Sequence, residues 1–253
     1  LSAIADWSKE SDQASANFGV SVDGAGDVNN DGFDDVIIGA DLYDNGQTDE
    51  GKVFVYYGSA TGLSATADWS KEGDQAYALM GWTVAGAGDV NDDGYADVII
   101  HADNYDNGQS DEGKVWVHHG SATGLSITAD WSAEGDQDWS YFGEWVAGAG
   151  DVNGDGYSDI IIGAGDYDNG EEDEGKVWVY HGSATGLSVT AGWTTESNQV
   201  SAYLGWPAAG AGDVNGDGYA DIIIGSRDYD NGEEDEGKIW VYYGSAAGLS
   251  AVA

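Results

Sequence analysis

The chain has 253 residues, of which 47 are acidic and 7 are basic, so its formal charge is -40 at pH 7. A charge of this sign repels nucleic acid and anionic membrane surfaces, and it attracts cations and basic partners. The chain has no cysteine, which excludes disulfides and thiolate metal sites. Life in high salt, where counterions screen a dense acidic surface, is a second explanation of the same acidity.

A 62-residue repeat organises the whole chain. The nine-residue segment Asp27–Asp35 recurs at the same spacing at Asp89–Asp97, Asp151–Asp159 and Asp213–Asp221. A period this strict is typical of a repeat protein. We therefore interpret residues 1–253 as one domain of four repeats, with the boundaries 1–62, 63–124, 125–186 and 187–248 and a terminal strand segment 249–253.

Each repeat predicts a meander of four short strands. In the first repeat these strands are Phe18–Gly26, Asp35–Ala40, Lys52–Tyr57 and Leu63–Trp69. Turn-rich segments separate them, and helical periodicity is absent. One small antiparallel sheet cannot bury both faces, so neighbouring sheets must stack, and radial stacking gives a β-propeller. The predicted fold is all-β, a propeller of four four-stranded blades.

The repeated Asp-rich loop has the pattern of a metal-binding loop. Oxygen-bearing side chains stand at positions 1, 3, 5 and 9, a glycine stands at position 6, and position 7 offers a backbone carbonyl. Hard oxygen donors at this spacing favour calcium, with magnesium as the alternative. An EF-hand would need Glu at position 12, where this chain has isoleucine. The candidate metal ligands are Asp27, Asn29, Asp31, Phe33, Asp35, Asp89, Asn91, Asp93, Tyr95, Asp97, Asp151, Asn153, Asp155, Tyr157, Asp159, Asp213, Asn215, Asp217, Tyr219 and Asp221.

A second acidic loop lies between the second and third predicted strands. In the first repeat it contains Asp44, Asn45, Asp49 and Glu50. This spacing matches no metal loop, so we interpret the segment as a solvated hairpin connection, with calcium binding as the alternative. A lysine follows the loop in every repeat, and we expect each one to pair with a local carboxylate; these are Lys52, Lys114, Lys176 and Lys238.

The motif set resembles the FG-GAP repeat of integrin α-chain propellers and of many bacterial secreted and cell-surface proteins. The resemblance rests on Phe18-Gly19, Gly26–Gly32, Ile37–Ala40 and Gly51–Val53, and on their equivalents through the chain. It implies four-stranded blades, calcium in each Asp-rich loop, and an extracellular or cell-surface location. The chain departs from the pattern where Met80 and Leu204 replace the Phe, and where His101 replaces a Gly.

Closure of a four-bladed ring needs a fourth strand for the last repeat. Leu1–Trp7 aligns with Leu63–Trp69, whereas the last repeat ends in Leu249–Ala253. We predict that the N-terminal strand completes the last blade and removes its open edge. In the alternatives, the four repeats belong to a longer array, or the two terminal segments pair between molecules and build dimers or filaments.

A cluster of aromatic residues varies between repeats and is therefore not fixed by packing. Its members are expected on the face opposite the calcium loops, where they would bind a sugar or a basic peptide. In the alternative, they fill a narrow central channel. The candidate ligand-face residues are Trp82, Trp139, Tyr141, Trp145 and Trp206.

The sequence contains no repeated nucleophile, histidine and acid constellation and no phosphate-binding glycine loop, so we predict no enzymatic activity. The predicted function is an extracellular, calcium-stabilised binding or adhesion module for a protein or carbohydrate ligand. We predict that the chain neither binds nucleic acid nor inserts into a membrane, and that it is able to associate with further copies of itself. The alternative function is a structural repeat protein that assembles into surface layers or fibres.

Overall fold

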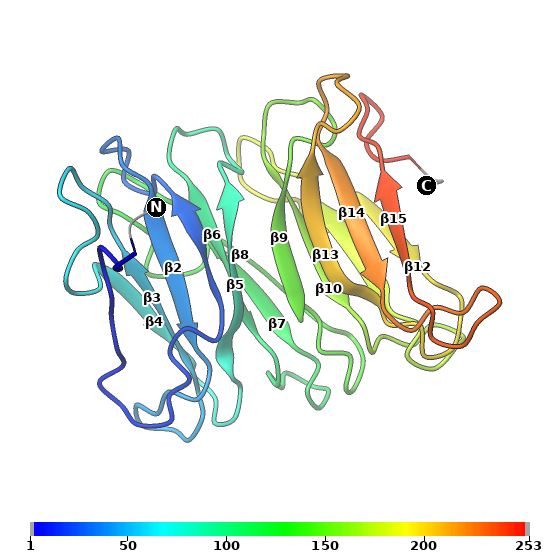
Figure 1. The fold of residues 1–253 in the computed structure, drawn as a ribbon, viewed down its shortest axis with the longest axis horizontal. Coiled ribbons are helices and arrows are strands. Elements are labelled where there is room, and N and C mark those ends of the chain that lie inside the picture. The colour runs from blue at the N-terminus through cyan, green and yellow to red at the C-terminus, as the bar shows by residue number, and fades with distance from the viewer. Residues whose placement is uncertain (1–2, 251–253) are drawn as a thin grey trace.

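The computed structural model describes residues 3–250, and these form four antiparallel sheets (Figure 1). The strands of the first sheet, β1 to β4, are Val22–Gly26, Asp35–Ala40, Lys52–Tyr56 and Trp69–Glu72. Those of the second, β5 to β8, are Met80–Gly88, Asp97–Ala102, Lys114–His118 and Trp131–Glu134. Those of the third, β9 to β12, are Trp145–Gly150, Asp159–Ala164, Lys176–Tyr180 and Trp193–Glu196. Those of the fourth, β13 to β15, are Leu204–Gly212, Asp221–Ser226 and Lys238–Tyr242.

The prediction of an all-β chain built from repeated antiparallel sheets is confirmed. Within each sheet the strands pair in chain order, as in a meander. The described residues contain no α-helix, so none of them forms a helix long and apolar enough to cross a membrane. The sheets stand side by side in a row, and the first strands β1, β5, β9 and β13 contact one another in that order.

Several strand boundaries of the first repeat differ from the prediction, and the first and fourth strands differ most. The first strand of the first repeat begins at Val22 rather than Phe18, and a turn in which Val20 donates its N–H to the Asn17 carbonyl precedes it. The fourth strand begins at Trp69, where the prediction ended it, because Ser64 donates its N–H to the Tyr57 carbonyl in the preceding loop. The pattern located each element but not its ends.

The hydrophobic core lies between successive sheets. The β-branched second strands supply its centre, since Ile37, Ile99 and Ile161 are fully buried. Val53 and Val55 of β3 pack in one cluster with Val84 and Ile100 of the second sheet. Each sheet therefore buries its apolar faces against its neighbours, as a repeat protein requires.

Glycines allow the backbones of neighbouring sheets to touch. A Cβ atom on Gly39 would lie 2.0 Å from the Gly81 carbonyl oxygen, and one on Gly163 would lie 2.4 Å from that of Gly205. His101 takes the equivalent place in the second sheet, where it is fully buried and its ring lies against Gly143. This histidine is a packing residue between two sheets.

The structure does not show the predicted ring of four blades. The first and last sheets lie at opposite ends of the row (Figure 1), and β15 is the outer strand of a three-stranded sheet. The N-terminal segment packs on the first sheet instead of pairing with β15: the Trp7 ring contacts the Tyr56 ring at 5.1 Å. This contact with the first sheet holds the segment at the end of the row far from β15. The segments Leu1–Ser2 and 251–253, to which the predicted terminal pairing extends, lie outside the described residues.

Candidate functional site

The Asp-rich loops join the first and second strands of each sheet, so all four lie at the same end of the strands. A β-bulge at Gly26, where the pairing of β1 with β2 changes register, turns the chain into the first loop. Gly32 then has a φ of 93°, a left-handed conformation that favours glycine. The remaining loops have glycine with positive φ at the same position, namely Gly94, Gly156 and Gly218.

Side-chain oxygens at positions 1 and 3 converge on the backbone N–H of position 5 in each loop. In the first loop the Asp31 N–H is donated to Asp27 Oδ1 at 3.0 Å and to Asn29 Oδ1 at 2.9 Å. Asp27 Oδ2 accepts the N–H of Gly32 at 2.7 Å. The same hydrogen bonds recur in the other three loops with distances between 2.8 and 3.1 Å. The loop backbone therefore holds these oxygens in place before any ligand arrives.

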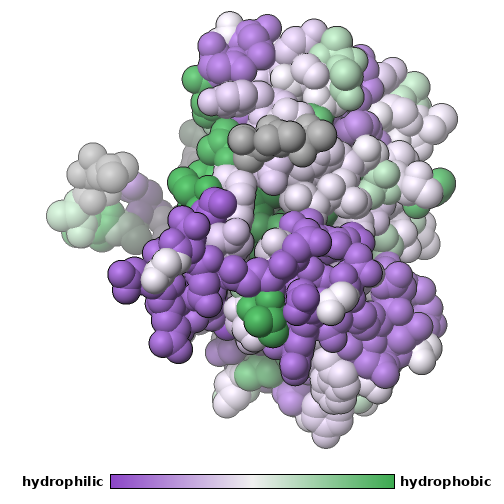
Figure 2. Space-filling model, turned by 90° about the vertical axis from the view of Figure 1, so that its right-hand side faces the viewer, coloured by the Kyte–Doolittle hydropathy of each residue, from purple (hydrophilic) through white to green (hydrophobic). Residues whose placement is uncertain are grey.

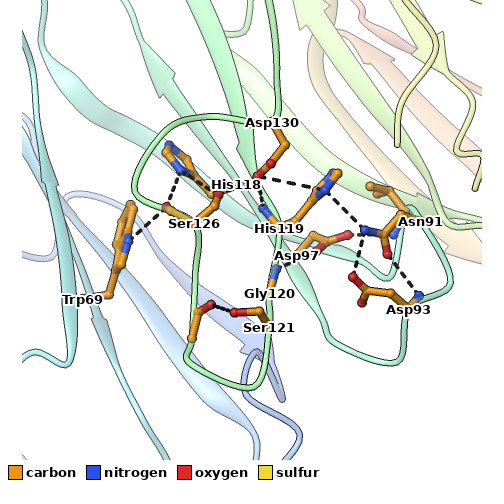
Figure 3. Close-up of polar contacts among 12 residues, drawn as sticks. Trp69, Asn91, Asp93, Asp97, His118, His119, Gly120, Ser121, Ser126 and Asp130 are labelled. Carbon is orange, nitrogen blue, oxygen red and sulfur yellow. Dashed lines mark hydrogen bonds and ion pairs between the residues drawn. The ribbon is translucent and has the colours of Figure 1, made fainter. Parts of the chain in front are cut away.

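The aspartate at position 9 is a buried anchor. Asp97 is fully buried, accepts the Val90 N–H at 2.8 Å and accepts the Gly120 N–H at 2.9 Å (Figure 3). It thus connects the loop to the turn between the third and fourth strands. Asp35, Asp159 and Asp221 make the equivalent pairs of hydrogen bonds. The structure brings positions 1, 3 and 5 together and gives position 9 this additional structural role.

The surroundings of the anchor disfavour its charged form. Burial raises the pKa of Asp97 to about 6, although two N–H donors oppose the shift. Burial also raises the pKa of Asp159 to about 6. In Figure 3 the His119 ring lies near Asn91, whose Nδ2 is 3.3 Å from His119 Nδ1.

The donor chemistry of the loops fits a hard divalent cation. Each loop offers carboxylate and amide oxygens together with the carbonyl at position 7, and oxygen is the donor that calcium prefers. Between residues 3 and 250, no three His, Cys, Asp or Glu side chains cluster closely enough to form a metal centre by themselves. Asn oxygens and backbone carbonyls must therefore complete any calcium shell in these loops.

In the second acidic loop, carboxylates accept hydrogen bonds from backbone N–H groups of the same loop. Glu50 Oε1 accepts the Asn45 N–H at 2.6 Å, and Asp44 Oδ1 accepts the Asp49 N–H at 2.7 Å. These contacts describe a closed hairpin connection. The expected ion pairs of the lysines are found in three repeats, where the lysine contacts a glutamate of the fourth strand, as in Lys52–Glu72, Lys114–Glu134 and Lys176–Glu196.

Three of the predicted ligand-face aromatics come together. Trp82, Trp145 and Trp206 line one hollow of about 270 Å³ with Glu144. Trp82 stands near the start of β5 and the metal loop follows its end, so the hollow and the loops lie at opposite ends of the strands. The two remaining candidates are not part of the hollow lining: Trp139 is 57% exposed, and Tyr141 is half-buried.

A buried acidic group beside this hollow was missed by sequence reasoning. Burial raises the pKa of Glu144 to about 7, with the nearby Asp166 adding to the shift, and Glu144 Oε2 has no hydrogen-bond partner. Burial raises the pKa of Asp103 to about 8, with Glu144 as the next cause. The Arg227 guanidinium lies over the Trp206 ring at 3.5 Å. The only sequence signal was an aspartate directly after two of the four second strands, namely Asp41 and Asp103.

The fold and loops define a repeat protein of small β-sheets, each with one Asp-rich loop. The FG-GAP repeat model matches residues 18–56, 80–118, 142–180 and 205–242, which together cover more than half of the chain. The chain belongs to the FG-GAP repeat family.

The relatives include integrin alpha chains. Integrin alpha pat-2 of Caenorhabditis briggsae is 33% identical over 218 residues, which cover 79% of this chain and 17% of that protein. Integrin alpha-6 of Homo sapiens is 35% identical over 156 residues, or 61% of this chain and 13% of that protein. Phosphatidylinositol-glycan-specific phospholipase D of Rattus norvegicus is 34% identical over 177 residues, or 66% of this chain and 21% of that protein. The chain thus spans about a fifth or less of each of these relatives.

Proposed function

We propose that this chain is a calcium-stabilised, non-catalytic binding module of an extracellular or cell-surface protein, with its sheets as blades of a β-propeller. The observation that carries the calcium proposal is the loop geometry. Four loops hold three oxygen-bearing side chains in one arrangement, with hydrogen bonds that agree within a few tenths of an ångström. Random clustering of turn residues does not produce four matching loops.

Calcium would offset the repulsion within each loop. Asp27, Asp31 and Asp35 occupy one short loop in a chain of net charge -40, and burial together with the first two carboxylates raises the pKa of Asp35. A divalent cation stabilises the charged form of such carboxylates. Four sites filled at ten times their Kd would contribute about 6 kcal/mol to the free energy of unfolding.

Calcium removal tests this proposal. We expect chelation to lower the Tm, and titration calorimetry to find four ions per chain. Magnesium at the same concentration serves as the control for cation charge alone. An unchanged Tm with no binding heat would refute the metal assignment.

The aromatic hollow is the proposed ligand site. Its volume of about 270 Å³ suits one side chain or one sugar ring, rather than a larger molecule. Three indole rings offer flat apolar contact, and the acidic residue Glu144 lines the same hollow. A cationic side chain of a basic peptide satisfies both features, and a sugar ring satisfies the first.

Binding assays distinguish these ligands. Arrays of basic peptides and of glycans probe the intact chain and the Trp145→Ala variant, with Trp139→Ala as a matched control outside the hollow. We expect the Trp145 change alone to abolish binding. A ligand that binds both variants equally would place the binding surface elsewhere.

A further inference from the structure

Each end of the row exposes a face that is buried everywhere else. On the last sheet Val214 is 55% exposed and Ile239 is 67% exposed, whereas their equivalents in the other three repeats are fully buried. On the first sheet Val22 is 64% exposed, whereas its equivalent Val84 is 5% exposed. The two end faces are therefore the two halves of an interface that the chain already forms three times between its own sheets.

The N-terminal segment already occupies the place of a preceding sheet's fourth strand. Trp7 donates its Nε1–H to the Ser64 carbonyl at 3.1 Å. The three other equivalent tryptophans, which begin β4, β8 and β12, make the same contact with the next repeat at 3.2, 3.0 and 3.2 Å. Gln13 Nε2 donates to the Asp44 carbonyl at 2.7 Å, as its equivalents do to the later repeats. The segment is thus docked in register on the first sheet.

Within residues 3–250 the last sheet has three strands, and this segment has the sequence of a fourth. The sequence Trp7–Glu10 is identical to that of β4. In the first sheet Lys52 lies opposite Glu72, and Val53 lies opposite Lys71. The same register on β15 places Glu10 opposite Lys238 and Lys9 opposite Ile239, as a consequence of the 62-residue spacing.

The charges at the free edge agree with this pairing. In the first three repeats the lysine that begins the third strand contacts a glutamate of the fourth strand at 2.7 to 3.1 Å. Within residues 3–250, Lys238 is exposed and no carboxylate lies within ion-pair distance of it. In the proposed register Glu10 supplies the missing carboxylate.

Within one molecule of this shape the segment Trp7–Glu10 cannot pair with β15, because the first and last sheets lie at opposite ends of the row (Figure 1). Figure 2 looks onto the C-terminal end, where hydrophobic side chains reach the surface beside strongly hydrophilic loops. The first sheet has a matching apolar groove of about 370 Å³, lined by Trp7, Val22, Val36 and Leu63. We propose that a second copy of this chain binds head to tail, with Trp7–Glu10 of one copy as the fourth strand on β15 of the other.

Such an interface joins two different surfaces, so it closes into a ring or continues into a chain of molecules, depending on the rotation between copies. The head-to-tail interface does not depend on the proposed calcium and ligand functions. Its tests measure the molecular mass and the cross-links between molecules, both at one fixed calcium concentration.

The first test measures mass. Light scattering of the 253-residue chain is expected to show a dimer or a longer assembly. Ile239→Lys places a charge in the apolar face and is expected to weaken association about tenfold or more. Val189→Lys is the matched control, because Val189 is 91% exposed and its equivalent Ile127 is 83% exposed although a further sheet follows it. A monomer at all concentrations, or equal effects of both variants, would overturn the proposal.

The second test measures register between molecules. The chain has no cysteine, so one population carries Lys9→Cys and another carries Ile239→Cys. Under mild oxidation we expect a disulfide-linked heterodimer after mixing, and none from either population alone. A chain that carries both substitutions and forms only an internal disulfide would show closure within one molecule and would refute the head-to-tail dimer. Absence of any cross-link would refute the register.

Discussion

At the residue scale, exposed and buried aspartates of the same loop have different structural roles. Asp31 lies at an exposed loop position, and its Oδ1 accepts the Phe33 N–H. Asp35 is 1% exposed and both of its oxygens accept N–H groups. Sequence spacing predicted both as metal ligands. Only the tertiary structure shows that the second also connects the loop to the turn after β3.

A single loop position tests the metal proposal. We expect Asp155→Ala to reduce the stoichiometry of bound calcium by one ion and to lower calcium-dependent stability by about one quarter, since the four loops are equivalent. Glu171→Ala in the same repeat is the control, because this exposed residue belongs to the second acidic loop. Calorimetry at saturating calcium measures both, and an unchanged stoichiometry would contradict the assignment.

The buried carboxyl of Asp103 predicts a pH dependence. Its pKa rises from an ordinary 3.8 to about 8, because of burial and then of Glu144, Asp111, Asp166 and Asp41. The His101 Nε2 atom lies 3.9 Å away, but burial lowers the pKa of this histidine to about 3, so the ring adds no positive charge at neutral pH.

A carboxyl whose pKa is raised on folding stabilises the folded state least when it is ionised. Its contribution to stability is full below about pH 4 and is lost as the pH rises toward 8. We therefore expect Asp103→Asn to raise the Tm more at pH 8 than at pH 5 in thermal melts. Glu234→Gln, at an exposed position, controls for the loss of one negative charge. An equal effect of the two changes would contradict the argument.

At the element scale, the sheets approach one another through glycine rather than through side chains alone. Gly163 in β10 leaves no room for a Cβ atom beside the Gly205 carbonyl. The sequence showed a glycine at the end of the strand, but its packing partner lies in the next repeat. His101 breaks this pattern, and it is accommodated by Gly143 and by a contact with Thr83 Oγ1 at 3.2 Å.

Substitution of this glycine tests the sheet contact. We expect Gly163→Ala to destabilise the fold by about 1 to 3 kcal/mol, since the added methyl group overpacks a backbone contact. Gly165→Ala is the matched control, because a Cβ atom on Gly165 would lie 3.5 Å from its nearest neighbours, which are Glu144 Oε2 and Trp206 Cβ. Urea unfolding measures both free energies, and equal values would show that the sheets separate at low cost.

At the scale of the whole molecule, the row of sheets has two different ends. The apolar ends are complementary because every internal interface joins the same two faces. The N-terminal segment was expected to complete the last sheet, and it carries the right sequence for that role. In the structure it packs on the first sheet, so this pairing requires the ends to meet, either within one chain or between two.

The sequence by itself determined the elements and the loops. Strict spacing and local chemistry, such as glycine at the left-handed position and β-branched residues in the second strand, specify them within each repeat. The tertiary structure decided which loop aspartate is buried, which aromatic residues share a hollow, where the carboxyls of Asp103 and Glu144 lie, and that the row stays open. These features depend on contacts between repeats, and four nearly identical repeats carry no local signal for the angle at which they pack.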